Sequence, residues 1–277
     1  MNWFLGIIIG DGYIDDRHIE IHNSSPTILR EVVRTIKNEI DFPLMRVKVD
    51  VYSDSNKVCV KWSNILELPL QNVKTKKNLS PWATNSERVR IRIASKEIVN
   101  LIKKKLRNKK KWPIKDKRLF IKGLFDAEAH VDYKGYIEFK QKADYKKIKM
   151  VKDVFKELKT DQIECTKPKI KNDYKKQKQD IYFCVKDLER YYKLIGFIDR
   201  KKQKTLNLLI EISKLKKDLT EKEIINNLGK EPVTITYLME ELKCPYHKIR
   251  KMLSLLSEKN LVIKNKLGNK HTYLLVR

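Results

Sequence analysis

The hydrophobic and polar positions of the chain follow the same order in two separate segments. Each segment opens with an apolar, helix-like run, continues with a stretch in which apolar and polar residues alternate, and then becomes helix-like again. Strict alternation is typical of a half-buried strand, and apolar residues three and four apart are typical of a helix. The expected elements are 1–12, 18–23 and 26–40 in the first segment, and 118–129, 136–142 and 144–159 in the second.

Further alternating and helical stretches complete each segment. We expect strands at 46–52, 58–62 and 88–93 in the first, and at 166–171 and 180–185 in the second. Closing helices are expected at 96–106 and 187–195, followed by a long helix at 200–216. The stretch 63–87 has no counterpart in the second segment and contains Pro69 and Pro81, so we interpret it as an inserted loop.

The two segments form an internal repeat. Gly123 and Glu128 both lie 117 residues after Gly6 and Asp11, so the two apolar runs match at a single offset. A constant offset between matching runs indicates duplicated structural units. The pattern predicts two domains of similar fold, at 1–112 and 113–216.

The last part of the chain, 217–277, has a different pattern. Three helical stretches, at 220–228, 234–243 and 245–259, are followed by two short strands at 261–266 and 271–276. The first helix begins with Thr220 and Glu223, which fit a capping box. Three helices and a two-stranded wing describe a winged helix-turn-helix domain.

Charge adds the next constraint. The 277 residues include 62 Lys plus Arg and 35 Asp plus Glu, a formal net charge of +27, while 41% of residues are hydrophobic. That hydrophobic content is enough for buried cores and argues against disorder. The excess of positive charge favours an anionic partner, and nucleic acid is the commonest one. A basic ribosomal or membrane-surface protein would share this charge.

The cysteines and the apolar runs exclude other classes. Cys59, Cys165, Cys184 and Cys244 form no CxxC pair, which argues against a zinc site. The apolar run 3–9 is too short to span a bilayer and lacks the features of a signal peptide. We therefore expect a cytoplasmic protein with no membrane partner.

The repeated apolar runs also carry the candidate chemistry. Gly6 and Gly10 are four residues apart, so these small residues share one helix face and allow a close approach between helices. Packing of the two runs through such faces would bring Asp11 and Glu128 together at the helix ends. Acids are disfavoured at a helix C-terminus, and two neighbouring acids repel each other. A divalent cation removes this conflict, so the arrangement predicts a metal site suited to phosphodiester hydrolysis.

These runs resemble the two copies of the LAGLIDADG motif of homing endonucleases. The motif copies are FLGIIIGDG at 4–12 and IKGLFDAEA at 121–129, and the resemblance extends over roughly the first four-fifths of the chain. It implies an α+β fold of two pseudo-symmetric αββαββα halves whose curved antiparallel sheets lie in the major groove of DNA. It also implies a monomer that cuts both strands of a long, asymmetric target site.

The resemblance also assigns residues to the metal site. The family's catalytic acids fall at Asp11 and Glu128, and with the adjoining Gly10 and Ala127 they make up the metal set, for two or three Mg²⁺ or Mn²⁺ ions. Ala129 in place of the usual closing glycine departs from the motif. Asp126 and His130, beside Glu128, are interpreted as packing or solvated neighbours.

Three further residues are catalytic candidates. Gln141 and Lys142 resemble a Gln-Lys pair near the metals of some archaeal members, although Asn23 and Ser24 stand at the matching first-half positions. A plain groove or phosphate contact is an equal alternative for this pair. A lysine near the start of the late helix is also expected, with Lys202 and Lys204 both in range; we select Lys202.

The alternating strands supply the candidate DNA contacts. Basic side chains on one strand face can bind phosphates or read guanine edges, and they can also be ordinary solvated positions. In the C-terminal domain, the helix at 245–259 either contacts DNA or belongs to a protein-interaction or structural cap. The DNA-binding set is Arg46, Lys48, Lys61, Arg88, Arg90, Arg92, Lys140, Lys142, Lys167, Lys169, Lys248 and Arg250.

The predicted function is site-specific cleavage of double-stranded DNA. We expect a standalone intron-homing type of enzyme, because the sequence begins at the first motif and shows no splicing blocks of an intein. The alternative is a protein of the same fold that does not cleave DNA, either a transcriptional regulator or an RNA-splicing maturase. The presence of both acids argues against that alternative.

Overall fold

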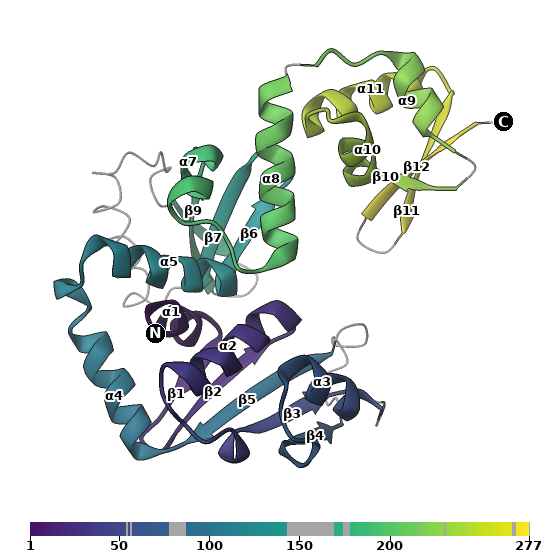
Figure 1. The fold of residues 1–277 in the computed structure, drawn as a ribbon. Coiled ribbons are helices and arrows are strands. Elements are labelled where there is room, and N and C mark those ends of the chain that lie inside the picture. The colour runs from purple at the N-terminus through teal and green to yellow at the C-terminus, as the bar shows by residue number, and fades with distance from the viewer. Residues whose placement is uncertain are drawn as a thin grey trace.

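The computed structural model describes residues 1–53, 55, 57–77, 87–142, 169–173, 178–215, 217–229, 231–267 and 270–276. The fold is mixed α+β, with three sheets in which every described pairing except one is antiparallel (Figure 1). The helix expected at 144–159, together with Cys165 and Lys167, lies outside the described residues.

The first sheet has the strand order β1-β2-β5-β3-β4. Strand interiors alternate between buried and exposed side chains, as in β5, where Val89, Ile91 and Ile93 are buried and Arg88 is exposed. One face therefore packs under helices and the other faces solvent. The elements are α1 (Asn2–Asp11), β1 (Gly12–Ile14), β2 (His18–Asn23), α2 (Pro26–Asn38), β3 (Lys48–Tyr52), α3 (Val58–Leu66), β4 (Val73–Lys76), β5 (Arg88–Ala94) and α4 (Lys96–Arg107).

The second sheet repeats the order of the first. Its order β6-β7-β9-β8 matches β1-β2-β5-β3, strand for strand, in the described part of the chain. The duplicated pattern expected from the sequence is thus present in the topology. The elements are α5 (Ile114–Glu128), β6 (Ala129–Asp132), β7 (Tyr136–Lys142), β8 (Lys169–Asp173), β9 (Lys178–Val185), α7 (Leu188–Leu194) and α8 (Arg200–Leu215).

The strand predicted at 58–62 is wrong, because these residues belong to helix α3. Val58, Trp62 and Leu66 are buried at intervals of four, whereas Val60 is 53% exposed. That is the burial of a helix, not of a strand. The indole Nε1 of Trp62 donates to Glu87, 2.7 Å away, which ties the helix to the start of β5.

The stretch 63–87 is also more ordered than the predicted loop. Helix α3 continues to Leu66, a 3₁₀ turn follows at Leu70–Asn72, and β4 then pairs in parallel with β3. Residues 78–86 lie outside the described part. The insertion therefore adds a fifth strand to the edge of the first sheet.

The C-terminal residues form three helices and a small antiparallel sheet of order β10-β12-β11. The sequence predicted the helices and two of the strands; the short β10 is an addition. Helix α10 lies beside α8, where Lys243 pairs with Glu211 at 3.2 Å and Lys204 pairs with Glu240 at 3.4 Å. The elements are α9 (Glu221–Asn227), β10 (Val233–Thr234), α10 (Ile235–Leu242), α11 (Tyr246–Glu258), β11 (Val262–Leu267) and β12 (Lys270–Leu275).

Within the described ranges, no helix combines the length and the apolar character that crossing a bilayer requires.

Candidate active site at the paired helix ends

Helices α1 and α5 pack backbone to backbone through their glycines. A Cβ placed on Gly6 would lie 2.1 Å from the carbonyl oxygen of Phe120, and one placed on Gly123 would lie 1.9 Å from that of Trp3. No side chain fits at such distances, so glycine is required at both positions. The glycine spacing in the sequence correctly indicated this close approach, which joins the two halves.

The contact continues to the C-terminal ends of both helices. A Cβ on Gly10 would lie 2.5 Å from the Cβ of Ala127 and 3.1 Å from the Cγ of Glu128. Asp11 is the last residue of α1, and Glu128 is the last residue of α5. Both acids are half-buried, so they lie at a surface that a ligand can reach. The structure therefore brings the two predicted acids to the same place.

The side chain of Asn23 fixes Asp11. Its amide donates to Asp11 Oδ2 at 2.5 Å, while its Oδ1 accepts a hydrogen bond from the backbone N–H of Ser25 at 2.7 Å. Asn23 ends strand β2, directly beside the end of α1. The sequence offered this residue only as a match to the second half, and its bond to Asp11 was not foreseen.

The register of the second sheet places Gln141 and Lys142 in the corresponding positions. The turn between β6 and β7 is one residue longer than the turn between β1 and β2. The backbone position of Gln141 therefore corresponds to that of Asn23, and the position of Lys142 corresponds to that of Ser24. This agrees with the match made from sequence. Their side chains lie outside the described part of the structure.

Lys202, near the start of α8, lies beside the same helix ends. Its Nζ donates to the carbonyl oxygens of Phe125, at 3.1 Å, and of Asp126. A cation at a helix C-terminus is favourable because the free carbonyls there carry partial negative charge. Burial lowers the pKa of Lys202, and the nearby carboxylates, including Asp11 and Glu128, oppose that shift. One lysine is thus electrostatically coupled to both motif acids.

Asp126 anchors the site from the inside. It is only 1% exposed and accepts hydrogen bonds from Trp3 Nε1 at 2.8 Å and from the backbone N–H groups of Ile198 and Asp199, each at 3.0 Å. Burial raises the pKa of its carboxyl group, although these donors oppose the shift. Asp126 therefore holds the start of α8 against α5, in keeping with a packing role. His130, in contrast, is exposed.

Asp199 connects the halves beside Lys202. Its Oδ1 accepts from the backbone N–H of Lys202 at 2.9 Å, which is a helix N-terminal contact, and its Oδ2 accepts from the hydroxyl of Ser25 at 2.6 Å. Ser25 belongs to the first half, and Asp199 to the second. Sequence reasoning missed both residues; the available signal was that each precedes a predicted helix and has a capping side chain.

On the outer face of the first sheet, the predicted arginines are partly neutralised. Arg90 donates to Asp50 at 3.1 Å and pairs with Glu20 at 3.4 Å, and Arg92 Nε donates to Glu20 at 2.7 Å. Arg88 is exposed on the same strand. These arginines lie on the sheet face predicted for them. Asp50 and Glu20, which the sequence did not single out, hold Arg90 and Arg92 in place.

Two other predicted contacts lie off the strands. Arg46 is in a 3₁₀ turn before β3, with its guanidinium 5.2 Å from the ring centroid of Phe42. Lys61 is on α3, where it pairs with Glu87 at 2.9 Å. Both assignments assumed a strand position, and that assumption is wrong.

The remaining predicted contacts are spread over the second sheet and the C-terminal helices. Lys140 is exposed on β7, and Lys169 begins β8, where only its backbone is described. On α11, Lys248 donates to the carbonyl oxygen of Lys217 at 2.7 Å, so it is engaged within the protein. Arg250, two residues later, is exposed.

The acids suit a labile metal site better than a closed one. Among the described residues there is no group of three or more His, Cys, Asp or Glu side chains arranged to hold a metal. A Mg²⁺ ion does not need such a cage, because it commonly uses one or two carboxylates, waters and substrate phosphates. The pair of half-buried carboxylates therefore fits a magnesium-type ion that binds together with its substrate.

Comparisons with known proteins return likenesses in structure alone. No protein-family model matches the chain, and no curated protein matches its sequence. Among solved structures, the homing endonuclease I-DmoI in complex with DNA and Ca aligns over 74% of this chain and 95% of its own, with 13% identity and a TM-score of 0.47. The N-terminal LAGLIDADG domain of DUF199/WhiA aligns over 80% of this chain and 84% of its own, with 14% identity and a TM-score of 0.42.

Proposed function

We propose that this protein is a site-specific endonuclease of the LAGLIDADG type that hydrolyses phosphodiester bonds in double-stranded DNA. One observation carries the proposal. Two carboxylates end two helices that pack through glycine, and the ammonium of one half-buried lysine contacts the last turn of the second helix, within the electrostatic influence of both acids. Acids at such positions are unfavourable unless cations compensate them, so their pairing has a chemical purpose.

The chain supplies the following parts of the chemistry. Asp11 and Glu128, with the adjoining Gly10 and Ala127, would hold two or three Mg²⁺ or Mn²⁺ ions. Bound metal supplies an activated water and stabilises the leaving oxygen. Asn23 orients Asp11 through its amide, 2.5 Å away.

Lys202 would contribute positive charge to the same site. Its ammonium is held by carbonyl oxygens at the end of α5, next to the acids. There it offsets the repulsion between the carboxylates and attracts a phosphate group. Gln141 and Lys142, at the end of β7, would add contacts from the second half. No step of this scheme requires a residue far from the two helix ends.

The rest of the molecule would position the DNA. The basic outer faces of the two sheets would lie along a long, asymmetric target, and a monomer would contact both halves of it. The division into domains at 1–112, 113–216 and 217–277 belongs to this proposal and is supported by one sheet in each part. The last domain has the helix and strand order of a winged helix, and exposed Arg250 on α11 would contact DNA.

The test is cleavage of a pool of randomised duplexes by the full chain, with the cut ends sequenced, at several Mg²⁺ concentrations. Asp11→Asn and Glu128→Gln should each reduce cleavage by about 10²-fold or more while DNA affinity is kept, because removing a negative charge near phosphates does not weaken binding. Asp16→Asn, at an exposed acid outside the site, is the matched control and should cut normally.

Two outcomes would count against the enzyme. Binding to defined sequences without cleavage in any divalent ion would identify a DNA-binding protein that does not cut, which is the regulator or maturase alternative. Equal loss of binding and cleavage in the acid variants would mean that the acids serve the fold and not the chemistry.

A further inference from the structure

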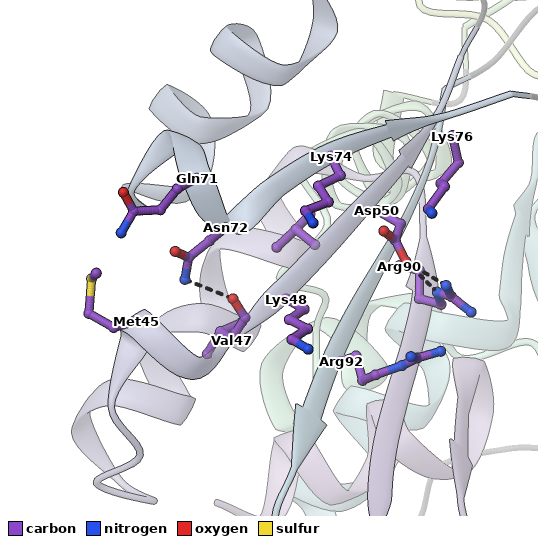
Figure 2. A pocket seen from close by; sticks show the side chains of 11 residues that line it. Met45, Val47, Lys48, Asp50, Gln71, Asn72, Lys74, Lys76, Arg90 and Arg92 are labelled. Carbon is purple, nitrogen blue, oxygen red and sulfur yellow. Dashed lines mark hydrogen bonds and ion pairs between the residues drawn. The ribbon is translucent and has the colours of Figure 1, made fainter.

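A hollow of about 380 Å³ lies on the outer face of the first sheet, away from the paired acids. It is located where the inserted strand β4 joins β3 (Figure 2). Five of its lining residues are cationic, and the only acidic one is Asp50. The charged residues are Lys48, Asp50, Lys74, Lys76, Arg90 and Arg92.

The charges of this hollow fall into two groups. Arg90 and Arg92 are paired with Asp50 and Glu20, as described above, so their charge is largely balanced. Lys48, Lys74 and Lys76 are exposed and form no ion pair with any residue that the structure describes. Asp50 lies opposite Lys74 but is engaged by Arg90, so the hollow keeps an excess of positive charge that a bound anion would offset.

Side-chain hydrogen bonds hold the wall of the hollow in place. The side-chain amide of Asn72 donates both of its hydrogens, to the carbonyl oxygens of Leu44 at 2.7 Å and Val47 at 2.8 Å. These bonds fasten the chain entering β4 to the chain entering β3. Figure 2 shows the Asn72–Val47 bond, with Lys48 and Lys74 on the strands that follow it and Lys76 at the far end of β4. The lysine backbones are therefore fixed relative to one another before any ligand binds.

The strand geometry matches a nucleic-acid backbone. Lys74 and Lys76 are alternate residues of one strand, so they share a face, with Cα atoms about 6.6 Å apart. That is similar to the distance between successive phosphates along one DNA strand. Lys48 lies on the neighbouring strand, two residues before Asp50, which is the direct partner of Lys74, so Lys48 and Lys74 are diagonal neighbours about 7–8 Å apart. A row of phosphates can thus meet the three lysines together.

We propose that Lys48, Lys74 and Lys76 bind the sugar–phosphate backbone of duplex DNA at the outer end of the first half. This rests on the proposed function for the identity of the polyanion. In the described part of the second sheet, β8 is the edge strand and nothing corresponds to β4. The inserted strand therefore makes the footprint of the first half longer than that of the second. Contacts of this kind add affinity but no sequence information.

The test compares Lys74→Ala/Lys76→Ala with a control that removes two exposed lysines from helices, Lys37→Ala/Lys96→Ala. Binding of the full-length variants to a selected duplex is measured without divalent metal, over a range of salt concentrations. Each lost phosphate contact lowers the slope of log K against log salt by about 0.9, so the β4 variant should lose about 1.8. The control should keep the parent slope, and thermal melting checks that all variants fold.

Phosphate-ethylation interference locates the contact. The β4 variant should lose interference at the outer end of one half-site only, with the central contacts unchanged. Equal slopes and equal interference patterns in the β4 variant and the control would overturn the site. Competition by inorganic tripolyphosphate that depends on Lys74 and Lys76, without any change at DNA phosphates, would also overturn it, in favour of a small polyanion.

The proposed function can fail separately. A parent protein that binds a duplex but never cuts it contradicts the nuclease and leaves the lysine site to be judged by its slope and interference. A parent that cuts, combined with an unaltered slope in the β4 variant, contradicts the lysine site alone.

Discussion

At the scale of single residues, position relative to the helix ends separates two neighbouring lysines. Lys202 is half-buried, and its ammonium contacts carbonyl oxygens at the end of α5. Lys204 is exposed and pairs with Glu240 on α10. The sequence placed both lysines near the start of a helix but did not show which of them faces the acids. Residues two positions apart on a helix point in very different directions.

Replacement of Lys202 by methionine should therefore reduce cleavage without reducing DNA binding to the same extent. The change removes the charge beside the acids and keeps most of the side-chain volume. We expect the single-turnover cleavage rate to fall by about 10²- to 10³-fold, a typical loss for one preorganised electrostatic contact. The measurement is single-turnover cleavage at saturating protein with the dissociation constant determined in parallel.

Lys204→Met provides the control, since it removes the same charge from the same helix at an exposed position. Its cleavage rate should match that of the parent. If both variants lose activity equally, the effect belongs to the folding of α8 and not to the ammonium beside the acids.

The predictability of the site differs from residue to residue. Asp11 and Glu128 could be singled out because both end a repeated apolar run, a signal that is local in sequence. Asn23, Asp126 and Asp199 act through partners brought close by the tertiary fold, such as Ser25 with Asp199. No periodicity encodes such pairs, so the sequence offered Asn23 only as a matching position and Asp126 as a packing or solvated neighbour, and it did not single out Asp199.

At the scale of elements, the alternating pattern at 58–62 led to the wrong prediction of a strand where the structure has helix α3. Val58, Val60 and Trp62 are alternate residues, which predicts a strand, but the stretch belongs to a short helix of nine residues. The burial follows the helical period, because Val58, Trp62 and Leu66 are buried whereas Val60 is exposed. Short apolar runs are ambiguous for this reason, whereas the longer patterns of β5 and α4 were read correctly.

The glycines between α1 and α5 give an element-scale prediction. Gly6→Ala places a methyl group 2.1 Å from the carbonyl oxygen of Phe120, a backbone atom that cannot move aside without displacing α5. Overpacking of this kind costs about 1–3 kcal/mol and sometimes more, so the free energy of unfolding should fall by at least that amount. Urea denaturation followed by circular dichroism is the measurement.

Gly229→Ala is the matched control for this change. The nearest atom to a Cβ at Gly229 is 3.9 Å away, which is an ordinary contact. Its stability should stay near that of the parent. Similar losses in the two variants would show that the approach of α1 and α5 is looser than the structure indicates.

At the scale of the whole molecule, repetition and asymmetry coexist. The two sheets share one strand order, yet only the first carries the insert that ends in β4. The sequence predicted the repeat from the constant offset between the two motifs. It predicted the position of the insertion because 63–87 has no counterpart in the second half. It did not predict that the insert folds back as an edge strand, because strand pairing depends on partners distant in sequence.

The net charge of +27 leads to the last prediction, which separates binding from chemistry. The exposed cations of the sheet faces and of α11 would contact phosphates and release counterions, so DNA affinity should fall by about 10³- to 10⁵-fold between 50 and 200 mM salt for 6–10 contacts. The proposed cleavage site, at Asp11 and Glu128, is half-buried, and salt screens buried charges much less than exposed ones. The single-turnover cleavage rate at saturating protein should therefore change far less over the same range. Filter binding and cleavage time courses on one duplex measure both quantities, and an affinity that does not respond to salt would contradict the assignment of these faces to the DNA backbone.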